Sequence, residues 1–265
     1  MSIVPDPTPM SPMSPMSPTS PMSRRAAMSA TRRPSGAAAL TFALLALLVG
    51  PAPTTAQDED IPVRSGGIEV EGWVGQVDAR AAEDGMTVED TRFAAEGDGF
   101  RITTGPGTTY WNPANTATGS YTVSARFHEP AYMALNSHPH PYGIVVAGNG
   151  MGTNTQSYLY CSAYGNGTYI VRGFGPEPFQ LNGPRPQQHP AVNRAQGEGS
   201  PVTQEIAVAV RDDAVECIIN GEVVATFDRD QVVGEGLLSS TDGVWGLRVG
   251  HNADVIVTGL GTSQP

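Results

Sequence analysis

Short runs of alternating apolar and polar residues, cut by turn sequences, are the feature that most constrains the fold of this chain. In "YTVSARF" (121–127) the side chains of Tyr121, Val123 and Phe127 alternate with polar ones. This is the period of a β-strand with one buried face. "YGIVVAG" (142–148) is apolar throughout, which is typical of a strand covered on both faces. No stretch has a convincing helical period, although "DRDQVVGEG" (228–236) could form a short helical turn.

Turn sequences separate these runs at close intervals. Gly165-Asn166-Gly167 lies between "SYLYCSAY" and "TYIVRGF", and Asn220-Gly221 lies between "AVECII" and "EVVATFD". Asn and Gly both tolerate positive φ, so these are strong hairpin signals. The pattern predicts an all-β fold of eight or more antiparallel strands, packed as a β-sandwich. The segment from Phe174 to Pro201 is rich in Pro, Gly, Gln and Asn, and we expect one long surface loop there.

One row of each strand should face the core. The expected inward residues are Val123, Phe127, Leu159, Val171, Ile206, Val208, Val210, Val215, Ile219, Val223, Phe227, Leu247, Val249, Val255 and Val257. Cys161 and Cys217 fall on the same rows. If the strands pair in sequence order, two other strands lie between the two strands that carry the cysteines. The resulting separation exceeds about 7 Å, the largest distance between Cα atoms that a disulfide spans. We therefore expect two buried free thiols, unless the two strands lie on opposing sheets.

Residues 1–56 have a different character from the rest. A Met-Ser-Pro repeat (10–22) precedes four arginines, the apolar run "AAALTFALLALLVG" (37–50) and "PAPTTAQ". This order is typical of a secretory signal peptide, with cleavage after Ala56. The alternative is a membrane anchor, but the apolar run is short for a bilayer span of about 20 residues. We expect a periplasmic or secreted protein with no membrane span after cleavage, and a single sandwich domain at 57–265.

Charge excludes some partners. The formal net charge of the chain is −11, and four of its 15 basic residues precede the apolar run. Nucleic acids and anionic membranes both require basic patches. We therefore expect no nucleic-acid partner. Nothing in the sequence indicates an oligomeric state.

Two sets of segments resemble known families. The segment "AVECIINGEVVATFDRDQVVGEGLLSSTDGVWGLRVGHNADVIVTGL" resembles the C-terminal half of concanavalin A-like lectin/glucanase jelly rolls. The segments "GFRITTGPGTTYWNPANTATGSYTVSARF", "HPHPYGIVVAGN" and "QSYLYCSAYGNGTYIVR" resemble exported bacterial proteins of the 3-keto-disaccharide hydrolase domain family. The resemblance spans about residues 100–260. It implies a concanavalin A-like jelly roll with an extracellular carbohydrate as ligand or substrate.

The polar face of the strands offers a candidate sugar site. Tyr158 and Tyr160 alternate with the inward residues of their strand, and we expect Arg172 and Glu216 to be their neighbours across the sheet. Aromatic rings stack on the C–H face of a sugar while charged groups bond its hydroxyls. Trp111, in "TTYWNPAN", could add a loop platform. Ordinary cross-strand packing of tyrosines and a Trp111 that caps the core are the alternatives.

Three histidines are further candidate site residues. His138-Pro139-His140-Pro141 cannot be helical, and in an extended chain the two imidazoles point to opposite sides. We therefore expect no metal site there. His140 could instead donate to a sugar hydroxyl or act as a base, and His251, in "GHNAD", is a second candidate contact or part of a polar turn.

The sequence is compatible with three functions. The first is an exported carbohydrate-binding module that uses Trp111, Tyr158, Tyr160, Arg172 and His251. The second is a hydrolase of 3-keto-glycosides, implied by the resemblance, with His140 or Glu216 as its base. The third is a structural envelope protein without a small ligand. The acids do not form the Glu-x-Asp-x-x-Glu or Glu-x-Asp-x-Glu pattern of retaining glucanases. We expect no cofactor, although the Asp- and Asn-rich turns would suit a structural calcium ion as well as they suit turns.

Overall fold

The computed structural model describes residues 59–264. The expected signal peptide and its cleavage site lie outside the described residues. Within them, the chain forms two eight-stranded β-sheets.

The first sheet, called here the β6 sheet, pairs antiparallel throughout except for β1 beside β3. Its strands, in spatial order, are β1 (Gly67–Ile68), β3 (Thr91–Glu96), β4 (Gly99–Thr104), β16 (Asp254–Ser263), β6 (Tyr121–Glu129), β12 (Val202–Val210), β13 (Ala214–Ile219) and β14 (Glu222–Asp228).

The second sheet, called the β7 sheet, is antiparallel. Its strands are β10 (Pro178–Gln180), β9 (Thr168–Phe174), β8 (Ser157–Tyr164), β7 (Pro141–Asn149), β15 (Gly243–Val249), β5 (Thr108–Ala117) and β2 (Val74–Val77), with β11 (Gln187–Gln188) also paired to β9. Short helices α1 (Ala79–Glu83), η1 (Val88–Asp90) and α2 (Arg229–Val232) lie between strands. The helical turn expected at 228–236 is therefore confirmed. Among residues 59–264, no helix has the length and apolarity that crossing a bilayer requires.

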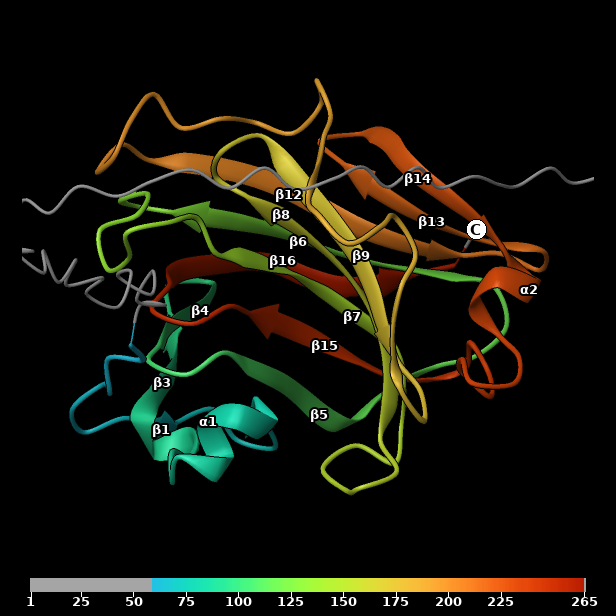
Figure 1. Cartoon of the computed structure of the whole chain (residues 1–265), viewed down its shortest axis with the longest axis horizontal. Coiled ribbons are helices and arrows are strands. Elements are labelled where there is room, and N and C mark those ends of the chain that lie inside the picture. Colours follow the sequence, from blue (N-terminus) through green and yellow to red (C-terminus); the bar gives the residue numbers. More distant parts are fainter. Residues whose placement is uncertain (1–58, 265) are drawn as a thin grey trace, which may run out of the picture. The chain divides into compact units, whose positions relative to one another are not determined.

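The chain passes repeatedly between the two sheets. It runs from β4 to β5, back to β6 and on to β7, and later from β14 to β15 and back to β16 (Figure 1). This alternation is the arrangement of a jelly roll. The all-β antiparallel sandwich expected from the sequence is confirmed.

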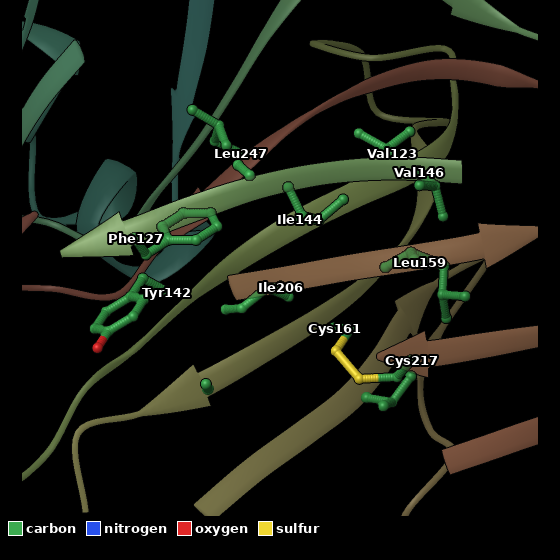
Figure 2. Close-up of a cluster of buried hydrophobic side chains, with 14 of the residues drawn as sticks. Val123, Phe127, Tyr142, Ile144, Val146, Leu159, Cys161, Ile206, Cys217 and Leu247 are labelled. Carbon is green, nitrogen blue, oxygen red and sulfur yellow. A yellow bond between two sulfur atoms is a disulfide. The ribbon is translucent and has the colours of Figure 1, made fainter. Parts of the chain in front are cut away.

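Apolar side chains fill the space between the sheets. Val123 and Phe127 of β6 meet Ile144 of β7 and Leu247 of β15, and all four are fully buried (Figure 2). Full burial of one such side chain contributes about 1.5–3 kcal/mol. Leu247 lies more than 100 positions along the chain from the other three residues, so the core joins distant segments of the described chain.

The expectation of free thiols is wrong. Cys161 on β8 and Cys217 on β13 form a disulfide, with Cα atoms 5.9 Å apart (Figure 2). β8 belongs to the β7 sheet and β13 to the β6 sheet. The two cysteines therefore face each other across the core, because the strands do not meander within one sheet.

One position of the expected core row is also wrong. Val223 is 48% exposed, whereas Val224 is 9% exposed and packs in the core. The reason is a β-bulge: Cys217 pairs with Ala225, but the next residue, Ile218, pairs with Val223. The bulge shifts the phase of β14 by one residue, so the inward side changes.

The segment 174–201 is more ordered than a plain loop. Its strands β10 and β11 pair with β9, and Val192 and Ala195 are buried. Strand pairing and two apolar anchors therefore hold this segment against the sandwich.

Candidate functional site

The outer face of the β7 sheet carries a cavity of about 300 Å³, called here the tyrosine cavity. It is lined by Gln76, Asp78, Thr109, Gln156, Tyr158, Tyr160, Arg172, Phe174 and Arg248, among others. Tyr158 and Tyr160 point outward because Leu159 and Cys161, between and beside them, point into the core. Tyr160 is the direct cross-strand partner of Arg172 on β9. Three of the residues expected from the sequence thus line one cavity.

A charged pair closes one side of this cavity. Arg248 on β15 is 11% exposed and its Nη2 lies 2.6 Å from Oδ2 of Asp78. Burial lowers the pKa of Arg248, but the nearby charge of Asp78 more than offsets this effect and the pKa is raised. Arg248 also lies over Tyr160, with Cζ 5.9 Å from the ring centroid, which is a cation–π distance. The guanidinium is therefore held in a fixed place and stays charged.

The aromatic wall consists of three rings. The ring of Phe174 lies 5.0 Å from that of Tyr158 and 6.5 Å from that of Tyr160. Burial raises the pKa of Tyr158, whose hydroxyl lies 3.3 Å from Oγ1 of Thr109. The phenol is thus neutral at physiological pH, and can donate as well as accept a hydrogen bond.

Two polar atoms in the wall of the tyrosine cavity have no hydrogen-bond partner among the described residues. They are Oε1 of Gln76, an acceptor, and Nε of Arg172, a donor. The terminal Nη2 of Arg172, by contrast, donates to the carbonyl of Pro184 at 3.3 Å. Buried polar groups are almost always paired in folded proteins. Both residues line the cavity, but these two atoms lie beneath its surface, with under 1 Å² of accessible area each.

The structure does not bring Trp111 or Glu216 into this cavity. Trp111 is 5% exposed, and a side chain at Gly152 would contact the indole ring, so the 150–156 loop lies against it. Glu216 is on β13 of the other sheet, where Oε2 lies 3.7 Å from Nε of Arg211. The expected proximity of Glu216 to Tyr160 and Arg172 is wrong, because β13 and β8 belong to different sheets.

The expectation that the imidazoles of His138 and His140 point apart is also wrong. Their ring centroids lie 4.3 Å apart, and the ring of His251 lies 3.8 Å from that of His140. The chain bends at Ser137 and His138 instead of running straight. Both rings therefore reach the same side, next to the turn that follows β15.

A second cavity, called here the Glu129 cavity, has a volume of about 450 Å³ and is lined by Arg101, Glu129, His138, His140 and Asp254, among others. Burial raises the pKa of the Glu129 carboxyl to about 7, despite a hydrogen bond from the backbone N–H of Met133. A carboxyl group with such a pKa in a cavity is a candidate acid–base group.

Sequence reasoning missed Glu129, Asp78 and Arg248. The sequence pattern does contain an indication of two of these residues. Glu129 continues the inward phase of Val123 and Phe127, where a carboxylate is unexpected, and Arg248 stands between the inward residues of an otherwise apolar strand. Asp78 gave no signal, because its role depends on a contact 170 positions away along the chain.

Comparison of the sequence with protein-family models and with curated proteins finds no match to either. The specific resemblance to the 3-keto-disaccharide hydrolase domain family is therefore not shown.

Solved structures include sandwiches of similar kind. The carbohydrate-binding module CBM66 from Bacillus subtilis has 7% identity, covering 75% of this chain and 99% of the module, with a TM-score of 0.49. A Bacillus subtilis protein of unknown function with a galectin-like fold has 14% identity, covering 78% of this chain and 94% of its own, with a TM-score of 0.48. The endo-β-1,3-glucanase from Pyrococcus furiosus has 12% identity, covering 72% and 87%, with a TM-score of 0.44. These likenesses concern strand arrangement, and no ligand or activity follows from them.

Proposed function

We propose that this protein is an exported carbohydrate-binding domain that holds its sugar in the tyrosine cavity. The observation that carries the proposal is one cavity lined both by an aromatic wall and by the guanidinium-bearing residues Arg172 and Arg248. Aromatic faces beside planar donors match a sugar, which presents C–H faces and hydroxyl groups that accept hydrogen bonds.

The size and chemistry of the cavity agree with such a ligand. About 300 Å³ lies at the lower end of small-molecule sites and suits one or two sugar rings. Tyr158, Tyr160 and Phe174 supply apolar faces for ring C–H groups, while Arg172 and Arg248 supply planar donors. The charge of Arg248 is already balanced by Asp78, so a neutral ligand fits better than an anion.

The Cys161–Cys217 disulfide supports export from the cytoplasm. Structural disulfides persist in oxidising compartments and are rare in the reducing cytosol. This agrees with the signal peptide expected at residues 1–56, and export is part of the proposal.

The test is titration calorimetry of the purified protein against a panel of mono- and oligosaccharides. Tyr160→Ala and Arg172→Ala should each weaken binding at least about tenfold, since each removes a wall group or a charged hydrogen bond. Arg126→Ala is the matched control: Arg126 lies on the outer face of the β6 sheet, 3.7 Å from Glu205, and should leave affinity unchanged. Thermal unfolding of each variant separates loss of binding from loss of fold.

The proposal fails if no sugar in the panel binds, or if Tyr160→Ala binds as the parent does. The first outcome would favour the structural role without a small ligand.

Hydrolysis of 3-keto-glycosides is the second candidate, and one observation favours it. Glu129, with its pKa raised by burial to about 7, lines the same cavity as His140. A carbonyl beside the ring carbons acidifies a neighbouring C–H group, and a base of this pKa could remove that proton near neutral pH.

Mass spectrometry of 3-keto-glycosides incubated with the protein tests this second function. Glu129→Gln and His140→Ala should abolish product formation, while Glu216→Gln, which does not line the Glu129 cavity, should not. Full turnover by Glu129→Gln would refute the role of the Glu129 cavity.

A further inference from the structure

We propose that His138, His140 and His251 form a binding site for one divalent transition-metal ion of the zinc type. The site lies where the loop before β7 meets the turn between β15 and β16. This inference does not rest on the proposed sugar-binding function, because none of the three histidines lines the tyrosine cavity.

The three rings are close enough to share an ion. Each histidine offers one ring nitrogen, and the three nitrogens all lie within 4.8 Å of one another. Nitrogens bound to one tetrahedral zinc at about 2.0–2.1 Å lie ~3.4 Å apart. Binding of an ion would draw the three nitrogens together by the difference between these two spacings. Imidazole is a preferred ligand of zinc, copper and nickel, whereas calcium and magnesium prefer oxygen.

A carboxylate stands behind one of the rings. Nδ1 of His251 lies 2.8 Å from Oδ1 of Asp60, although the contact lacks the alignment of a hydrogen bond. Metal-binding histidines characteristically donate their second ring N–H group to a carboxylate, which fixes the tautomer and makes the other nitrogen a better ligand. With Nδ1 next to this carboxylate, Nε2 is the ring nitrogen of His251 that is left for the ion.

Two asparagines hold the three segments of the site together. Nδ2 of Asn136 donates to the carbonyls of His251 and Asn252, at 3.1 and 2.6 Å. Asn252, which is 2% exposed, accepts from the N–H group of Ile61 and donates to the carbonyl of Glu59. The histidine loop, the turn and the segment carrying Asp60 are thereby fixed relative to one another. A fixed backbone lets side chains meet an ion at little cost in entropy.

Gly250 allows the turn to approach the loop so closely. A Cβ atom at Gly250 would lie 2.9 Å from Cδ of Pro141 and 3.1 Å from Cβ of His140. With glycine there, the N–H group of Gly250 instead donates to the carbonyl of Pro141 at 2.7 Å. The bond places His251, the next residue, beside His140.

The electrostatic surroundings favour a cation. His138 and His251 also line a cavity of about 610 Å³, called the acidic cavity, whose charged lining comprises Glu59, Asp60, Asp78, Asp84 and Arg80. Asp78 is paired with Arg248, but the other three carboxylates still outnumber the guanidinium of Arg80. The local potential is therefore negative, which concentrates cations. Three protein ligands beside an open cavity leave a fourth position for water, as in zinc sites that are not purely structural.

The test is metal binding by the purified, tag-free protein after treatment with a chelator. Calorimetry with Zn²⁺ should give one ion per chain, and the X-ray absorption spectrum should show nitrogen neighbours at about 2.0–2.1 Å. His140→Ala and His251→Gln should each weaken binding more than 100-fold, while Asp60→Asn should weaken it about 10- to 100-fold. Addition of azide should change the visible spectrum of the Co²⁺ form if the fourth position is open.

The chain supplies its own control, because His128 and His189 are the two other histidines of the sequence. The double variant His128→Ala/His189→Ala should bind Zn²⁺ as the parent does. Circular dichroism confirms that each variant is folded. Stoichiometric binding that persists in both His140→Ala and His251→Gln, or no binding by the folded parent, would overturn the proposal. An unchanged Co²⁺ spectrum with azide would overturn the open fourth position.

Discussion

The carboxylate of Asp78 neutralises the guanidinium of Arg248, with Oδ2 and Nη2 2.6 Å apart. Asp78 immediately precedes α1, whereas Arg248 belongs to β15. Their contact fixes the beginning of α1 against one side of the tyrosine cavity.

Replacing Asp78 with Asn should leave the Arg248 charge buried without a counter-charge. We expect the free energy of unfolding to fall by about 1–3 kcal/mol, because Arg248 is 11% exposed while Asp78 is 46% exposed and partly solvated. Urea denaturation measures this. The exposed Glu69–Arg92 pair is the comparison, and Glu69→Gln should cost about 0–1 kcal/mol. Equal costs for the two substitutions would contradict the argument.

The Cys161–Cys217 bond should account for a large share of stability. Its cysteines are 56 positions apart, for which the chain-entropy relation gives about 4 kcal/mol, against typical measured values of about 2–4 kcal/mol. Denaturation with and without reductant gives the difference. Alkylation of the unreduced, unfolded protein should label neither cysteine, and labelling of both would show the bond to be absent.

Stability should depend on pH through Glu129, whose pKa burial raises from 4.5 to about 7. Between these values the folded protein binds more protons than the unfolded chain. The free energy of unfolding should therefore fall as pH rises from about 4.5 to about 7, by on the order of 1–3 kcal/mol, and change no further above that range. Denaturant titrations at several pH values test this. Glu129→Gln should remove the slope, and an unaltered slope in that variant would assign it to other groups.

Neighbouring valines on β14 test the β-bulge. Val224→Ala should cost about 1–3 kcal/mol, because Val224 is buried in the core. Val223→Ala, at an exposed site, should change the free energy of unfolding by less than about 0.5 kcal/mol. Thermal or urea unfolding of the two variants is sufficient, and the reverse order of costs would place the bulge elsewhere.

The sequence was informative wherever structure depends on neighbouring residues. Alternation in 121–127 predicts the buried face of β6, and Asn220-Gly221, with φ of 52° and 86°, forms the expected hairpin turn. Tyr158, Tyr160 and Arg172 could be grouped because β8 and β9 are joined by a short turn.

Relationships across the sandwich could not be predicted in this way. The assignment of strands to sheets depends on packing between distant segments. The predictions of free thiols and of Glu216 as a neighbour of Tyr160 were therefore both wrong. The histidine cluster depends on a bend at Ser137 and His138 that is held by Asn136. The alternation of inward and outward residues on β14 also changes at a single bulge, and no local sequence pattern marks this bulge near Val224.

The disulfide has a consequence for the lifetime of the protein in the presence of proteases. Its two cysteines enclose the segment 174–201, in which residues 184–188 are all exposed. Exposed loop tips are where proteases cut first. A single cut there would leave a nicked molecule whose two fragments remain covalently joined through the core, so the sandwich could survive damage that would divide an unlinked chain.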